Sequence, residues 1–167
     1  IWCNRPGLIS FVLINLAFAD YQYRQYGQLS SQMIAYQLLS IGYVAGHYIQ
    51  EDFMLYAYDV LAEYFGMKLI YGILGIMPFL YPMAAWYLAD QPNSMPWYCL
   101  LGSLILAVGG GVLAKISDMQ KFTFRKYGEK ATIGGKPVVT IKTEGRSILV
   151  SGLWGVSRHM NYCGEIL

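Results

Sequence analysis

The chain has 167 residues, a normal length for one domain, but 56% of them are hydrophobic and only 13% are charged. This composition excludes an ordinary soluble globular domain. The net charge of +2 is small, and nothing in these residues indicates a nucleic-acid partner. The three cysteines are far apart and match neither a disulfide framework nor a zinc site, so we expect no bound metal.

Four stretches contain no Asp, Glu, Lys or Arg: residues 6–19, 25–50, 69–89 and 91–114. Three of them exceed the roughly 20 residues that a helix needs to cross a ~30 Å hydrocarbon core. We therefore predict an all-α fold, a polytopic transmembrane helical bundle. The chain begins without an initiator Met or a signal peptide and stops where a new helix should start, so we expect an internal piece of a longer protein.

The first predicted helix covers residues 8–19, after a turn at Arg5-Pro6-Gly7 and before a polar patch at 20–28. The second covers 31–49, and its polar side chains are spaced so that they share one face. Within a membrane span such a face should point to the bundle interior or to a wet cavity. The side chains could also serve only to tie helices together. They are Tyr36, Ser40, Tyr43 and His47.

The following elements alternate between the interface and the membrane. Residues 53–65 predict an interfacial amphipathic helix, and 67–88 predict a span that Pro78 and Pro82 can kink. The last complete span is 97–114. Residues 1–114 thus form the predicted transmembrane part, followed by a basic cytoplasmic segment at 115–150 and the start of a further membrane helix at 151–167.

Positive charge is concentrated after the last complete span. Eight of the twelve Lys and Arg residues lie between Lys115 and Arg146, which places this segment on the cytoplasmic side by the positive-inside rule. Lys121 and Arg125 are one helical turn apart, a spacing that suits a phosphate group and equally suits anionic lipid headgroups. Short β-prone runs at 138–141 and 147–150 predict a small hairpin or an ordered loop.

A dense polar motif ends the chain: Ser151-Gly152-x-Trp154-Gly155-x-x-Arg158-His159-x-Asn161-Tyr162-x-Gly164-Glu165. Isolated Trp and Arg residues at a membrane boundary usually act as interfacial anchors. So many polar side chains together favour a site for a charged ligand.

This motif resembles the signature of the sterol reductase family, which includes the Δ14- and Δ7-sterol reductases and the lamin B receptor. The family usually ends the motif with Gly-Asp, so Glu165 is a conservative difference. Gln120-Lys121-x-x-x-Arg125-Lys126 is similar to a second family motif, and 37–44 is similar to a third. The resemblance covers nearly the whole chain and is strongest in its last part.

The resemblance implies reduction of a ring double bond in a sterol, Δ14 first and Δ7 second, with NADPH as the cofactor. An unactivated alkene must be protonated before it accepts hydride, so the reaction needs an acid. The implied acid is Tyr43, assisted by His47, with Glu165 as the second candidate. The implied cofactor contacts are Lys121, Arg125, Leu149, Trp154, Arg158, Asn161 and Tyr162.

The implied partners are a sterol substrate and the lipid bilayer, of the endoplasmic reticulum in a eukaryote or of the inner membrane in a bacterium. Two alternatives remain open at this point. One is a membrane methyltransferase of the isoprenylcysteine type, which shares an Arg-His-x-x-Tyr-x-Gly arrangement. The other is a non-catalytic sterol-binding scaffold.

Overall fold

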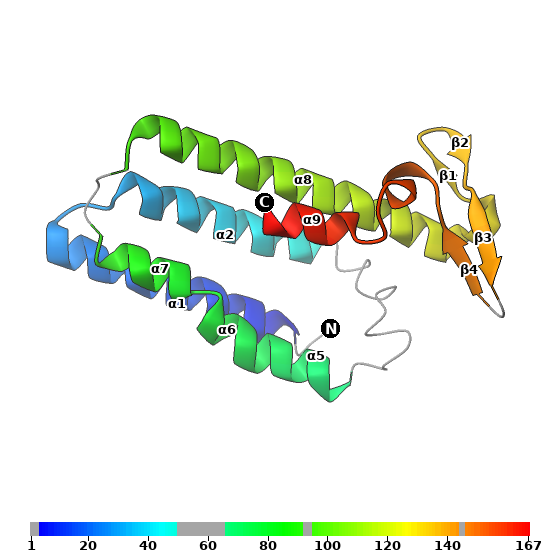
Figure 1. The fold of residues 1–167 in the computed structure, drawn as a ribbon. Coiled ribbons are helices and arrows are strands. Elements are labelled where there is room, and N and C mark those ends of the chain that lie inside the picture. Colours follow the sequence, from blue (N-terminus) through cyan, green and yellow to red (C-terminus); the bar gives the residue numbers. More distant parts are fainter. Residues whose placement is uncertain (1–3, 50–65, 92–94, 144–145) are drawn as a thin grey trace. The chain divides into compact units, whose positions relative to one another are not determined.

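The computed structural model describes residues 4–49, 66–91, 95–143 and 146–167. The chain divides into two compact units, Ile1–Leu100 and Leu101–Leu167, and helices dominate the described residues (Figure 1). The predicted interfacial helix at 53–65 lies outside the described residues.

The first helix, α1 (Asn4–Tyr26), is longer at both ends than the sequence predicts. Pro6 lies in its first turn, where a missing N–H costs no intrahelical hydrogen bond. Near the other end Arg24 pairs with Asp20 one turn earlier, at 2.7 Å. Such a pair supports a helix, so the polar residues continue it rather than end it. Gly27, with φ of +70°, provides the left-handed stop.

The second predicted helix is α2 (Ser31–Ile49). Some of its polar side chains are buried and others are exposed. Ser40 is buried, and buried Gln37 donates from Nε2 to the Asn15 carbonyl at 2.8 Å. Tyr43, by contrast, is 48% exposed.

The predicted span at 67–88 is a broken helix. A π-helical turn precedes Pro78, and a turn at Tyr81 and Pro82 separates the last helical piece. Proline has no N–H and clashes with the preceding turn, which accounts for both interruptions. The pieces are α5 (Met67–Tyr71), the π-turn (Gly72–Ile76), α6 (Met77–Leu80) and α7 (Met83–Ala89).

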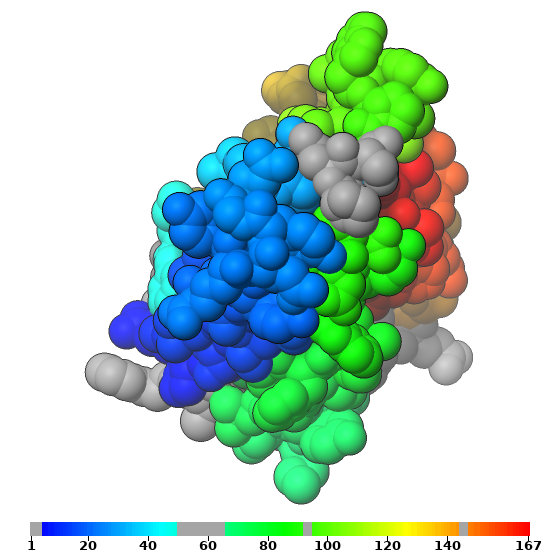
Figure 2. Space-filling view, turned by 90° about the vertical axis from the view of Figure 1, so that its left-hand side faces the viewer, coloured from blue at the N-terminus to red at the C-terminus, as the bar shows by residue number. Residues whose placement is uncertain are grey.

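In the first unit α1 is the central helix and packs against α2, α6 and α7. In Figure 2 the later part of α1, in blue, lies directly against the green chain of α6 and α7. Two small clusters of apolar side chains form the core between these helices. One contains Leu8, Phe11, Val44 and Met77, and the other contains Ala19, Met33 and Ala89.

The second unit contains most of α8 (Trp97–Tyr127) and the elements that follow it. Two antiparallel hairpins pair β1 (Thr132–Ile133) with β2 (Lys136–Pro137), and β3 (Thr140–Thr143) with β4 (Arg146–Leu149). The described residues are mostly helical, as the all-α expectation has it, and the second hairpin is the one that the β-prone runs allowed. A 3₁₀ turn (Gly152–Gly155) and α9 (Met160–Ile166) complete the unit.

Within the described residues, two helical stretches are long and apolar enough to cross a membrane, Met67–Ala89 and Trp97–Lys130. In the second stretch the uncharged residues end at Ala114, and charged side chains begin at Lys115. The apolar part of α8 is thus 97–114, and its charged part extends beyond it.

Candidate functional site

The charged part of α8 presents polar side chains to the segment that follows the hairpins. Because 3.6 residues complete one turn, side chains three and four residues apart point the same way. The side chains of Gln120 and Lys121 and the backbone carbonyl of Ser117 contact the 3₁₀ turn. One helix face therefore organises the site.

Trp154 is the residue of the 3₁₀ turn that docks on this face. Its indole Nε1 donates to the Ser117 carbonyl at 2.7 Å, and only 8% of the residue is exposed. The Lys121 Nζ lies 4.2 Å from the centre of the Trp154 ring, a cation–π contact. The buried ring thus fixes the position of the lysine.

A glycine and a glutamine hold the turn in place. The Gln120 Oε1 accepts the Leu153 backbone N–H at 2.9 Å. Gly152 has φ of +64°, and a side chain there would collide with Gln120 and Ile133. Gly152 of the motif is therefore explained by backbone geometry.

Asp118 lies at the centre of a group of charged and polar side chains. It accepts a hydrogen bond from the Asn161 side chain, and it is close enough to three basic residues for an electrostatic attraction. We call this group the Asp118 cluster; it consists of Lys115, Asp118, Lys121, Arg125 and Asn161. Glu165 of α9 lies close enough to repel Asp118.

Partial burial changes the ionisation of this cluster. Burial raises the pKa of Asp118, while Lys121 and then Lys115 oppose that change. Burial, reinforced by the charge of Arg125, lowers the pKa of Lys121. Both groups lie beyond the apolar part of α8. Three cations, Lys115, Lys121 and Arg125, face the carboxylates of Asp118 and Glu165, so the group can accept a further anion.

The Asn161 side chain has one unpaired hydrogen-bond acceptor among the described residues. Its Oδ1 is buried and has no hydrogen-bond partner among the residues that the structure describes. A buried acceptor without a partner is costly, so this oxygen is suited to a donor group of a ligand.

Helix α9 reaches the cluster through a backbone contact with α8. An added Cβ on Gly164 would lie 2.5 Å from the Gly110 carbonyl oxygen and 2.6 Å from the Ala114 nitrogen. Only glycine permits this approach, which carries Asn161 and Glu165 to the charged face of α8.

The predicted cofactor contacts fall into three groups. Lys121, Arg125, Trp154 and Asn161 come together in the second unit, at or beside the Asp118 cluster. Leu149 is buried in β4, where it pairs with Thr140 of β3. The other two predicted cofactor contacts are on the surface. Arg158 is exposed, and Tyr162, 54% exposed, stacks on His159 with ring centres 5.3 Å apart.

The predicted acids lie in both units. Tyr43 and His47 belong to the first, where their ring centres are 4.5 Å apart and the His47 Nδ1 lies 3.2 Å from the Tyr43 carbonyl oxygen. Glu165 lies beside Asp118 in the second.

Sequence reasoning did not single out Asp118 or Ser117. Asp118 could have been found, since it is three residues before Lys121 and seven before Arg125, on the same helix face. Ser117 contributes a backbone carbonyl, which has no sequence signature. No group of three or more His, Cys, Asp or Glu residues suited to a metal occurs in the part of the chain that the structure describes.

Comparison with known proteins decides the family. Residues 2–167 match the profile of the ergosterol biosynthesis ERG4/ERG24 family. The chain belongs to this family. It is 37% identical to a Delta(14)-sterol reductase of Dictyostelium discoideum over 174 residues, and 33% identical to one of Methylotuvimicrobium alcaliphilum over 169. It is 32% identical to a 7-dehydrocholesterol reductase of Danio rerio over 173 residues.

These alignments include 98–100% of this chain but only 36–39% of each ERG4/ERG24 relative. The chain therefore spans well under half the length of the relatives that it matches.

Proposed function

We propose that the full-length protein is an integral membrane enzyme that reduces a ring double bond of a sterol with NADPH. The first choice is the Δ14 bond and the second is Δ7, since relatives with both names match the chain. We place residues 1–114 in the membrane as part of a polytopic helical bundle. Residues 115–150 form the basic cytoplasmic segment, and 151–167 begin the next membrane helix.

The observation that carries the proposal is the pair of half-buried cations on α8, Lys121 and Arg125, of which Lys121 is fixed beside Trp154. Lys121 is held over the indole ring, and Arg125 is one turn away on the same helix face. Such a pair suits phosphate groups, because Arg offers a planar fork and Lys a point charge. The 2′-phosphate distinguishes NADPH from NADH and would be selected by a basic site.

The Asn161 side chain supports the same ligand. Its Oδ1 has no partner among the described residues and can accept from a donor group of the dinucleotide close to the phosphate, while Asp118 holds its amide nitrogen. Trp154 is nearly buried and already contacts Lys121, so we assign it the positioning of that lysine. Exposed Tyr162 and Arg158 are free to contact the rest of the dinucleotide.

NADPH, when bound, supplies the hydride. The chain's own residues supply a proton, hold the reactants and exclude water. We assign the proton to the Tyr43 hydroxyl, assisted by His47, with Glu165 as the second candidate. The proton adds to one carbon of the double bond and leaves a tertiary carbocation at the other, which hydride then quenches. The sum of the two steps is addition of H⁺ and H⁻ across the alkene.

The direct test incubates the full-length protein with NADPH or NADH and a panel of Δ14, Δ7 and Δ24 sterols, followed by product analysis. We expect reduction of the Δ14 sterol with NADPH and little with NADH. Binding of S-adenosylmethionine, or the absence of a reduced product from every sterol, would contradict the proposal.

A further inference from the structure

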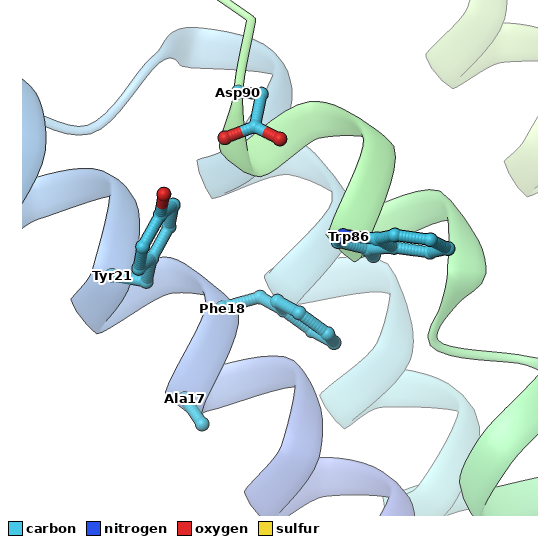
Figure 3. A pocket seen from close by; sticks show the side chains of 5 residues that line it. All are labelled: Ala17, Phe18, Tyr21, Trp86 and Asp90. Atoms are coloured by element: carbon cyan, nitrogen blue, oxygen red, sulfur yellow. The ribbon is translucent and has the colours of Figure 1, made fainter.

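The first unit contains a pocket of about 250 Å³ between α1 and α7, remote in sequence from the residues assigned above. Figure 3 shows the Asp90 carboxylate at one end, with Tyr21 and Trp86 on either side and Phe18 further along α1. Ala17 completes the lining. Three aromatic rings from two helices thus share one cavity with one carboxylate.

The carboxylate of Asp90 has no ion-pair partner among the described residues. The nearest candidate on α1, Arg24, is paired with Asp20 at 2.7 Å. The Trp86 and Tyr21 side chains are 58% and 49% exposed, so the pocket is open to a ligand. An acidic group above exposed aromatic faces attracts a cation, because the faces of aromatic rings are themselves electron-rich.

The walls of this pocket are fixed by hydrogen bonds between α1 and the end of α7. Buried Gln22 donates from Nε2 to the Leu88 carbonyl at 2.7 Å and to the Gln91 carbonyl at 3.2 Å. The Tyr26 hydroxyl donates to the Asp90 carbonyl at 3.2 Å. The backbone segments that carry the aromatic and acidic side chains are therefore held in place before a ligand arrives.

The pocket lies where an apolar stretch ends. The candidate span ends at Ala89, and Asp90 is the first charged residue after it. Trp and Tyr are the side chains that prefer the headgroup level of a bilayer. A ligand at this place would be a lipid headgroup.

We propose that this pocket binds the trimethylammonium group of a phosphatidylcholine. Asp90 could replace one of the hydrogen bonds that a primary ammonium makes to water, but the aromatic faces could not replace the others. A quaternary ammonium has no such bonds to lose, and its methyl groups can pack on Tyr21, Trp86 and Phe18 while Asp90 balances the charge.

The test titrates the purified full-length protein in detergent with phosphatidylcholine, phosphatidylethanolamine or phosphatidylglycerol, and counts bound lipids by native mass spectrometry. We expect phosphatidylcholine to bind about tenfold more tightly than phosphatidylethanolamine, a ratio in the range of cation–π effects. Asp90→Asn and Trp86→Leu should each remove that preference. Equal binding of the two lipids would overturn the proposal.

Two controls keep the interpretation specific. Trp97→Leu removes an exposed tryptophan that is not part of the pocket, and Glu129→Gln removes an exposed carboxylate already paired with Lys142. Both should keep the preference, and loss of it in either would overturn the assignment to this pocket. Choline chloride should compete with phosphatidylcholine; failure to compete would mean that the acyl chains, and not the headgroup, are recognised. The readout is lipid binding, so it is independent of sterol turnover.

Discussion

At the scale of single residues, Lys121 is the side chain on which the proposed cofactor site depends most. Its charge is half-buried and is positioned by Trp154 at 4.2 Å. Hydrogen bonds to a charged group such as this contribute about 1.5–3 kcal/mol. We therefore expect Lys121→Ala to weaken NADPH binding about 10- to 150-fold in isothermal titration calorimetry.

The matched control is Lys136→Ala, since Lys136 is an exposed lysine of β2. It should bind NADPH as the wild type does, and an equal loss in both variants would show only a general effect of net charge.

Because burial and Arg125 lower the pKa of Lys121, its charge is lost at a lower pH than that of an ordinary lysine. Affinity should thus fall as the pH rises, and Lys121→Arg should flatten this fall.

The sequence could predict only some of these residues, for physical reasons. The spacing of Lys121 and Arg125 and the motif around Trp154 can be read from the sequence. Both depend on the type of side chain at each position, which the sequence states directly. The Ser117 carbonyl that binds the indole is a backbone group, identical in every residue. The buried Oδ1 of Asn161 depends on how α9 packs, which no local pattern encodes.

At the scale of elements, the glycine contact between α8 and α9 determines where the last polar motif lies. A Cβ on Gly164 would meet backbone atoms of Gly110 and Ala114, which cannot move aside as a side chain can. Overpacking of this kind typically costs about 1–3 kcal/mol. Gly164→Ala should therefore lower the thermal unfolding temperature and weaken NADPH binding, because Asn161 is displaced.

Gly109→Ala is the comparison for this variant. An added Cβ at Gly109 meets none of the described atoms within 4 Å, so the change should leave both stability and NADPH binding intact. Unchanged unfolding of Gly164→Ala would show that α9 does not pack on α8 in this way.

The ends of helices were predictable where the sequence has a clear helix-starting or helix-ending residue. Residues 31–49 form α2, and α8 begins at Trp97 after Pro96, as the pattern indicates. The extension of α1 beyond residue 19 was missed because its polar residues look like a boundary, although Asp20 and Arg24 pair along the helix. Pro78 predicts an interruption of the helix, but the π-turn that precedes it is a backbone arrangement that no residue type specifies.

At the scale of the whole molecule, the residues proposed to bind the cofactor and the residue proposed to donate the proton belong to different units. The residues assigned to the cofactor lie in Leu101–Leu167, and the first-choice acid, Tyr43, lies in Ile1–Leu100. The family profile includes both units in one continuous match. The composition of the chain predicted a membrane protein, since charge-free stretches of about 20 residues or more are typical of membrane-spanning helices.

This division makes a prediction that separates binding from chemistry. Tyr43→Phe removes one hydroxyl proton and leaves the ring, so it should leave NADPH affinity nearly unchanged. A general acid contributes about 10²–10⁴ in rate, and turnover of the preferred sterol should fall by at least about that lower factor. The measurement compares steady-state kcat with the NADPH dissociation constant of the full-length protein.

Tyr48→Phe is the matched control, because Tyr48 lies five residues later on α2 and its hydroxyl donates to the Arg5 carbonyl at 3.3 Å. Loss of that bond should change stability slightly and leave kcat in place. If Tyr43→Phe keeps its turnover, the hydroxyl is not the proton source. The proton then comes from Glu165, and Glu165→Gln should stop the reaction instead.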